Sequence, residues 1–201
     1  MNRIYVFATS LMLLSAAQAA STRAGDPVDL LQPTEAWESW APRPEIAPAM
    51  SREAGGGPNS APVLTIAGGG NPDGCGCWRR PMPPLTAGRR YLIEAAFQCQ
   101  DVSAEGHCIW AMITRGKKEF DELVYRETRD GWHRMSLELA PNEDWNDLDL
   151  RLYLAWAPRG VVRWSAVRVT DITDQPAKRR IARLAAISGK PKDPKSIADC
   201  M

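Results

Sequence analysis

Tryptophan is the residue type whose chemistry is most conspicuous in this sequence of 201 residues, with eight tryptophans against three phenylalanines and four tyrosines. An indole ring has a broad apolar face and a donor N–H at its edge, so it packs into a core or stacks on a ligand. We expect Trp110 and Trp164 in the core, because their neighbours are apolar. Trp132 and Trp156 end predicted strands and Trp145 lies in a polar loop, so we predict that these three form a ligand platform; alternatively, they seal the rims of the domain.

Five cysteines occur at positions 75, 77, 99, 108 and 200. Cys99 and Cys108 flank a predicted turn at 102–106, and a hairpin there would place them opposite each other, close enough for a disulfide. The alternative is two free, buried thiols. The sequence leaves the pairing of Cys75, Cys77 and Cys200 open.

Metal-binding and catalytic patterns are weak. Cys75-x-Cys77 could be half of a zinc site, but His107 and His133 lie in separate segments and add no second ligand pair, so we expect no metal site. Glu119, Asp121 and Glu122 sit in one polar stretch, which is typical of a solvated face rather than of a glycosidase pair across a cleft. The sequence also lacks the glycine-rich and zincin motifs, and we predict no catalytic residue and no cofactor.

The first residues carry an export pattern. Arg3 precedes an apolar run, and Ala17-Gln18-Ala19 follows with small residues at the cleavage positions. We predict a signal peptide at 1–19, cleaved after Ala19 or after Ala20, with an uncleaved anchor as the alternative. The run is too short for a stable span, and we expect a secreted, periplasmic or cell-envelope protein without a membrane span after cleavage.

Charge is distributed unevenly along the chain. Residues 20–176 carry more Asp and Glu than Lys and Arg, whereas 176–201 is basic. An acidic body gives no electrostatic basis for nucleic-acid binding, which we exclude.

The body of the chain alternates as β-strands do. Residues 20–61 are rich in Pro, Ala, Gly and Ser, and we expect irregular structure there. From 62 to 175 the pattern changes to period two, most cleanly at 148–156, and the phase slips between Trp164 and Val167, which indicates a bulge. Strands at regular spacing with turn residues between them predict an all-β domain, an antiparallel β-sandwich over 62–175.

Four segments in this order resemble the jelly-roll domains of the galactose-binding-like superfamily, which includes many carbohydrate-binding modules. They are 87–91 (AGRRY), 130–132 (DGW), 140–141 (AP) and 160–169 (GVVRWSAVRV). The resemblance implies a jelly-roll sandwich and a glycan as its ligand. Such domains often hold a structural calcium ion, but its ligands cannot be matched to positions in this sequence.

The basic tail, 176–201, is similar to the start of another family. Residues 179–191 (RRIARLAAISGKP) resemble the opening strand of a carbon–nitrogen (nitrilase-like) hydrolase, and Ser196 would then cap its first helix. The catalytic glutamate, lysine and cysteine of that family have no counterpart here, and Cys200 comes too early to be the nucleophile.

Three functions are compatible with these patterns, one of which is a purely structural surface protein with a basic tail. The leading one is a non-catalytic, extracytoplasmic domain that binds a glycan or serves as an accessory domain for a partner enzyme. The second is the front part of an exported carbon–nitrogen hydrolase whose gene is truncated, which sequencing beyond Met201 would reveal.

Overall fold

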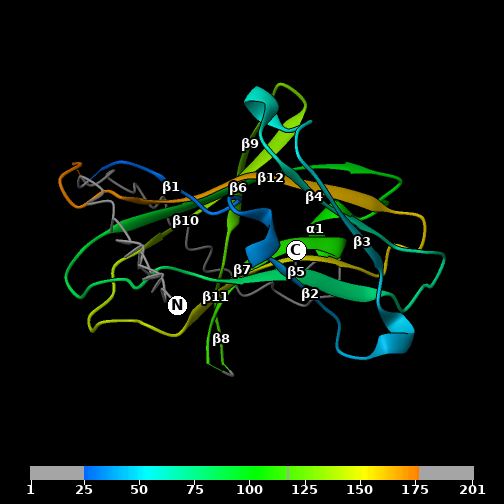
Figure 1. Cartoon of the computed structure of the whole chain (residues 1–201), viewed down its shortest axis with the longest axis horizontal. Coiled ribbons are helices and arrows are strands. Elements are labelled where there is room, and N and C mark those ends of the chain that lie inside the picture. The colour runs from blue at the N-terminus through cyan, green and yellow to red at the C-terminus, as the bar shows by residue number, and fades with distance from the viewer. Residues whose placement is uncertain (1–24, 117, 177–201) are drawn as a thin grey trace, which may run out of the picture.

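A computed structural model describes residues 25–116 and 118–176, and in this range the chain forms two antiparallel sheets packed face to face (Figure 1). The predicted antiparallel β-sandwich is therefore confirmed. The seven-stranded sheet has the spatial order β3 (Ala49–Glu53), β4 (Val63–Ala67), β12 (Val161–Asp171), β6 (Tyr91–Gln100), β10 (Trp132–Leu139), β9 (Val124–Arg129), with β1 (Val28–Asp29) also pairing with β12. The five-stranded sheet has the order β2 (Glu38–Trp40), β5 (Cys75–Pro81), β11 (Leu148–Ala155), β7 (Ile109–Arg115), β8 (Lys118–Glu122).

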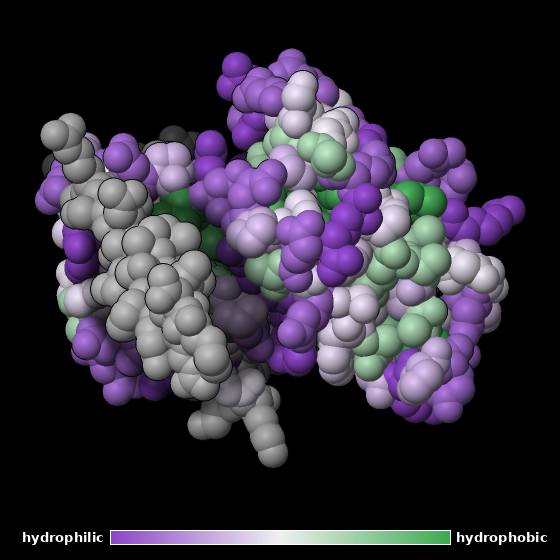
Figure 2. Space-filling view, in the orientation of Figure 1, coloured by the Kyte–Doolittle hydropathy of each residue, from purple (hydrophilic) through white to green (hydrophobic). Residues whose placement is uncertain are grey.

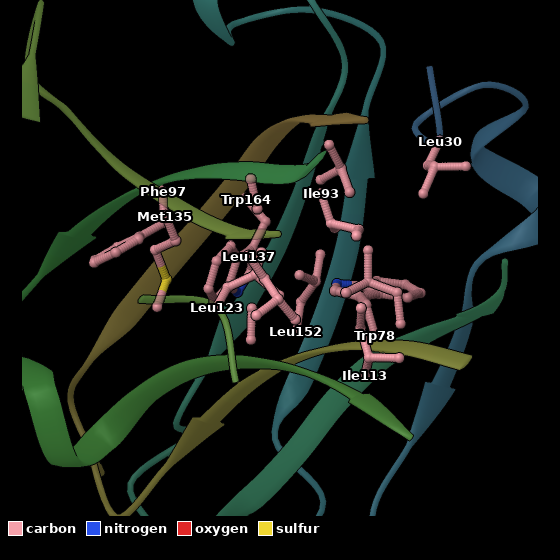
Figure 3. Packing of buried hydrophobic residues seen from close by; sticks show 14 of the residues in the cluster. Leu30, Trp78, Ile93, Phe97, Ile113, Leu123, Met135, Leu137, Leu152 and Trp164 are labelled. Atoms are coloured by element: carbon pink, nitrogen blue, oxygen red, sulfur yellow. The ribbon is translucent and has the colours of Figure 1, made fainter. Parts of the chain in front are cut away.

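The core lies between the sheets, where alternate side chains of both sheets meet. Figure 3 shows Trp164 and Ile93 of the seven-stranded sheet pointing toward Trp78 and Leu152 of the five-stranded sheet. The predicted alternation of β11 is confirmed, because its leucines are buried in this core while Asp149 and Arg151 point outward. Each buried apolar side chain of this size contributes about 1.5–3 kcal/mol to stability.

A bulge interrupts β12, as its phase slip predicts. The register of β12 against β6 shifts between Ser165 and Arg168. Ala166 has a φ of 49°, in the left-handed region, at this point. The extra residue keeps Trp164 and Val167 on the same buried side, although three positions separate them.

The predicted hairpin between 91–99 and 108–113 is wrong. β6 pairs with β10 and β12, whereas β7 pairs with β11 and β8, so the chain crosses from one sheet to the other through α1 (Glu105–Cys108). Cys99 and Cys108 are accordingly free thiols, and the predicted disulfide is not formed among the described cysteines. A turn-like segment shows where a strand ends but does not specify which sheet the next strand joins.

The segment predicted to be irregular, 20–61, contributes three short strands. β1 and β3 join the seven-stranded sheet, and β2 joins the five-stranded sheet. Between them lie the short 3-10 helices η1 (Thr34–Ala36), η2 (Pro44–Ile46) and η3 (Pro58–Ser60). Trp37 is fully buried and donates its indole N–H to the carbonyl of Leu30 at 2.7 Å. Strands of two to five residues separated by prolines are too short to show periodicity, and their pairing with longer strands stabilises them.

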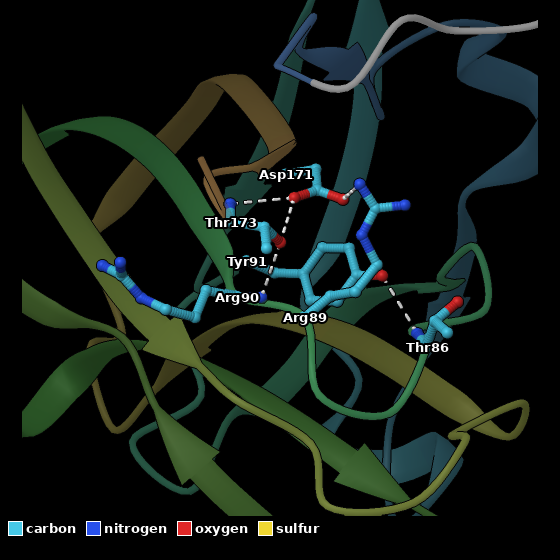
Figure 4. Close-up of polar contacts among 6 residues, drawn as sticks. All are labelled: Thr86, Arg89, Arg90, Tyr91, Asp171 and Thr173. Carbon is cyan, nitrogen blue, oxygen red and sulfur yellow. Dashed lines mark hydrogen bonds and ion pairs between the residues drawn. The ribbon is translucent and has the colours of Figure 1, made fainter. Parts of the chain in front are cut away.

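A polar network closes the sandwich where β12 ends (Figure 4). Asp171 pairs with Arg89 at 2.7 Å and accepts hydrogen bonds from the backbone N–H and the hydroxyl of Thr173 at 3.0 and 2.6 Å. The Thr173 hydroxyl oxygen in turn accepts the backbone N–H of Arg90 at 3.0 Å. These contacts fasten the end of the last strand to the start of β6.

Two predictions fall outside the described residues: the signal peptide at 1–19 and the hydrolase-like segment within 177–201. Within residues 25–116 and 118–176, no helix is long and apolar enough to span a membrane.

Candidate functional site

The outer face of the five-stranded sheet carries a line of aromatic side chains. Trp40 of β2 is in register with Cys77 of β5, Cys77 with Tyr153 of β11, and Tyr153 with Trp110 of β7. Trp156, just beyond the end of β11, extends the line. We call Trp40, Tyr153, Trp110 and Trp156 the aromatic row; it runs across the strands rather than along them.

The rings of the aromatic row hold one another in place. Tyr153 and Trp110 stack with ring centroids 4.8 Å apart and planes 11° apart, and Trp156 stacks on Trp110 at 5.8 Å and 28°. On the other side, Trp40 meets Tyr153 edge to face at 6.5 Å. These are favourable arrangements for aromatic pairs, so the row is pre-organised without a ligand.

Trp156 is the most exposed member of the row. Among the described residues, large apolar side chains are exposed only at Val28, Val124, Tyr125 and Trp156, and Trp156 has the largest exposed fraction, 59%. Figure 2 shows hydrophilic residues interspersed with white and green, more hydrophobic patches on the coloured part of one face.

The backbone also presents Trp156 in an unusual way. Its φ is 55°, a left-handed conformation that is rare for a bulky aromatic residue. Its N–H donates to the carbonyl of Gly74 at 2.8 Å, which fixes the turn at the end of β11. Strained conformations of this kind concentrate at functional sites.

A polar row lies beside the aromatic row, two residues along each strand. Glu38, Arg79 and Arg151 are in register there on β2, β5 and β11. Arg79 pairs with Glu38 at 2.7 Å, whereas the guanidinium of Arg151 lies over the Trp40 ring at 5.6 Å. The Nε of Arg151 has no hydrogen-bond partner in the part of the chain that the structure describes. That Nε is itself buried, so the exposed polar groups beside the rings are those of Arg79 and Glu38.

Burial keeps the floor of the site uncharged. It raises the pKa of Cys77 to about 12 and the pKa of Tyr153 to about 12. At neutral pH both groups are therefore protonated, and Cys77 acts as a small apolar residue under the rings. The face can bind an uncharged ligand without displacing a counter-charge from its floor.

The three tryptophans predicted to form a platform are not brought together. Trp156 belongs to the aromatic row, but Trp132 and Trp145 are each only 6% exposed. Trp132 packs on Val63 and Ala96 on the outer side of the seven-stranded sheet, and the Trp145 ring lies in the main core. Trp132 and Trp145 therefore fit the alternative interpretation, in which such residues seal the rims of the domain.

The other three aromatic residues of the row were not predicted to lie on an exposed platform. Trp110, predicted to be in the core, is half-buried on the outer face, because it alternates with Ile109 and Ala111, which point inward. Tyr153 was detectable: it continues the outward face of Asp149 and Arg151 in the clearly alternating strand β11. Trp40 had no such signal, since its strand is only three residues long.

Comparisons with known proteins are informative only at the level of structure. No protein-family model matches the chain, and no curated protein sequence matches it. The CBM22-1 xylan-binding domain of Paenibacillus barcinonensis Xyn10C is similar with a TM-score of 0.50 and 12% identity, over 76% of this chain and 99% of that domain.

Two further structures from Clostridium thermocellum are similar at lower scores. The family 11 carbohydrate-binding module has a TM-score of 0.49 and 12% identity, over 74% of this chain and 97% of the module. The CBM22-1–GH10 modules of xylanase 10B have a TM-score of 0.47 and 10% identity. The match covers 76% of this chain but only 28% of the xylanase chain. The chain likewise spans 23% of a GH51 α-L-arabinofuranosidase. At such low identity the likeness to the xylan-binding domain shows the fold alone, an antiparallel β-sandwich shared with carbohydrate-binding modules.

Proposed function

We propose that this chain is a non-catalytic glycan-binding domain and that the outer face of its five-stranded sheet is the binding surface. The observation that carries the proposal is the aromatic row with a polar row directly beside it. Sugars have apolar C–H faces and a rim of hydroxyls, and a surface with both kinds of group side by side suits them.

The contacts follow from the geometry of the two rows. One face of Trp156 rests on Trp110, so its other face is free for a sugar ring. Trp40, half-buried at the opposite end of the row, provides a second contact. Arg79 and Glu38, whose side chains are 38% and 62% exposed, lie next to the row and bind the sugar hydroxyls. Because the row crosses the strands, an extended glycan chain lies perpendicular to β11.

The comparisons support this proposal at the level of fold. The similar domain from Paenibacillus barcinonensis is described as xylan-binding, and the family 11 module was solved with a mixed-linked tetrasaccharide. We therefore take xylan and mixed-linkage β-glucan as the first polysaccharides to test.

The cellular role is part of the same proposal. We infer that the domain acts outside the cytoplasm, as the predicted signal at 1–19 suggests, and that it is an accessory domain for a partner enzyme. The resemblance of 179–191 to a carbon–nitrogen hydrolase supports an enzyme of that kind. Sequencing the gene beyond Met201 tests it: a hydrolase reading frame with the family's glutamate, lysine and cysteine supports the role, and an unrelated neighbour contradicts it.

Affinity electrophoresis through gels that contain xylan or mixed-linkage β-glucan tests the binding surface. We expect the wild type to be retarded by at least one polysaccharide, and Trp156→Ala and Trp40→Ala each to weaken binding about tenfold or more, as loss of an aromatic contact does. Tyr125→Ala is the matched control, since Tyr125 is 51% exposed but lies on β9 of the other sheet. Unretarded wild type, or equal losses in Tyr125→Ala and Trp156→Ala, would contradict the proposal.

A further inference from the structure

A second cluster of reactive side chains contains no member of the aromatic row, although Trp110 lines the same pocket as two of its residues. It comprises Cys99 of β6, Glu105 of α1 and His133 of β10, whose ligand atoms all lie within 4.8 Å of one another. The Nε2 of His133 is 3.8 Å from a carboxylate oxygen of Glu105. Cys99 and His133 are half-buried and Glu105 is exposed. A thiol, a carboxyl and an imidazole are three of the side-chain groups that bind zinc in proteins.

The fold, rather than the sequence spacing, assembles this cluster. His133 is in register with Phe97 on the neighbouring strand, and Cys99 is two residues further along the same side of β6. Diagonal neighbours of this kind are within reach of each other. The crossing from the seven-stranded to the five-stranded sheet then places Glu105, the first residue of α1, beside both.

The imidazole of His133 is held in an orientation that suits a metal ligand. Its ring stacks on Phe97 with centroids 4.8 Å apart and planes 22° apart. Its Nδ1 is 3.0 Å from the hydroxyl of Thr128, and that hydroxyl is 2.9 Å from the hydroxyl of Tyr125. With the Nδ1–H donating to Thr128, Nε2 carries the free lone pair and faces Glu105. Metal-binding histidines are oriented by the same kind of partner on their second nitrogen.

We propose that Cys99, Glu105 and His133 bind a zinc ion through Sγ, a carboxylate oxygen and Nε2. The thiolate and the carboxylate together balance the charge of Zn²⁺, so the half-buried site is neutral when loaded. Zinc–ligand bonds of about 2.0–2.3 Å require the three atoms to move together by on the order of 1 Å. Rotation of the Cys99 and Glu105 side chains supplies this movement, because Glu105 is exposed and lies on a single helical turn.

Three protein ligands leave a fourth position, as in zinc sites that bind water or a further ligand. Glu105 and His133 also line a pocket of about 520 Å³, together with Phe97, Trp110 and Tyr125. Arg163, which shares a neighbouring hollow with Cys99, is paired with Glu53 at 3.1 Å, so its charge is already balanced.

Metal titration of the full, reduced, metal-free chain tests the site. We expect one Zn²⁺ to bind per chain in competition with a chromophoric chelator, and Co²⁺ to give a thiolate-to-cobalt charge-transfer band in the near ultraviolet. Cys99→Ser abolishes the band, and His133→Gln and Glu105→Gln weaken Zn²⁺ binding by on the order of 100-fold, with Thr128→Val weakening it about tenfold. Glu105→Gln matters most, because an exposed residue can be changed without unfolding the domain.

Matched controls separate the site from other thiols and imidazoles. Cys75→Ser and His107→Gln leave the band and the affinity unchanged, because neither residue belongs to the cluster. A natively folded wild type that takes up no Zn²⁺ and shows no cobalt band overturns the proposal, as does a band that survives Cys99→Ser. The proposal is independent of glycan binding: failure of polysaccharide retention leaves it standing, and failure of zinc uptake leaves the aromatic row as proposed.

Discussion

The outer faces of the two sheets both carry arginine and tryptophan, but these side chains differ in their contacts and in their exposure. On the seven-stranded sheet, Arg168 pairs with Glu94 at 2.7 Å and Arg163 with Glu53 at 3.1 Å, and Trp132 is buried. On the five-stranded sheet, Arg151 has an Nε without a hydrogen-bond partner among the described residues, and Trp156 is 59% exposed. Each face has paired arginines and one buried guanidinium Nε without a partner among the described residues, so the difference lies in the indoles: one is covered and the other is exposed.

Residue type alone therefore does not mark a binding surface. Trp132 and Trp156 both stand at strand ends in the sequence, and both lie on an outer face in the structure. Trp132 packs on Val63 and Ala96, and Pro58 of η3 lines the same hollow beside it. An exposed ring that stacks on a row of partly buried rings, as Trp156 does, is the better indicator of a ligand.

The greatest difference in stability is expected between the two variants in which Trp132 or Trp156 is replaced by alanine. Trp132→Ala removes a buried indole and lowers the free energy of unfolding by about 3 kcal/mol. Trp156→Ala removes an exposed one and lowers it by less than about 1 kcal/mol. Urea unfolding of both variants measures this. Equal losses of stability would erase the distinction between the faces.

Alkaline pH is expected to have an intermediate effect, through the floor of the aromatic row. Burial raises the pKa of Cys77 from 9.0 to about 12 and that of Tyr153 from 10.0 to about 12. The folded state therefore holds both protons more tightly than the unfolded state. Their contribution to the free energy of unfolding is fully present below the ordinary pKa of a thiol. It is lost as the pH rises toward the pKa values of the folded state.

Urea midpoints measured from about pH 8 to about pH 11 follow this loss. Cys77→Ala should make the decline with pH shallower, because it removes one of the two groups. Trp156→Ala serves as the comparison and should keep the wild-type slope. An unchanged slope in Cys77→Ala would show that the buried thiol is not responsible.

The smallest effect is expected for an ion pair on the seven-stranded sheet. Glu94→Gln breaks the contact with Arg168. Because the side chains of Glu94 and Arg168 are 28% and 41% exposed, the change should lower the free energy of unfolding by less than about 1 kcal/mol. The difference from wild type should shrink in high salt. Polysaccharide retention should not change, and a loss of retention would assign the wrong face to the ligand.

The sequence predicts the sandwich well and the sites poorly, for identifiable reasons. Leucines at every second position predict β11 and its buried side, and the phase slip predicts the bulge in β12. Both patterns are local and need no knowledge of neighbouring strands. Trp40 and Trp110 join the aromatic row only because β2 and β7 flank β5 and β11, an order that the local pattern does not encode.

Sequence alone predicts the fold class and the longer alternating strands, because alternation follows from the geometry of a single strand. Only the tertiary structure decided which strands lie side by side and which tryptophans are covered. The crossing between the sheets separates Cys99, on β6, from Cys108, at the end of α1, and it brings Cys99 close to Glu105 and His133. The physical reason is that register across a sheet and crossing between sheets depend on packing between distant segments, and the sites of this protein are made from such contacts.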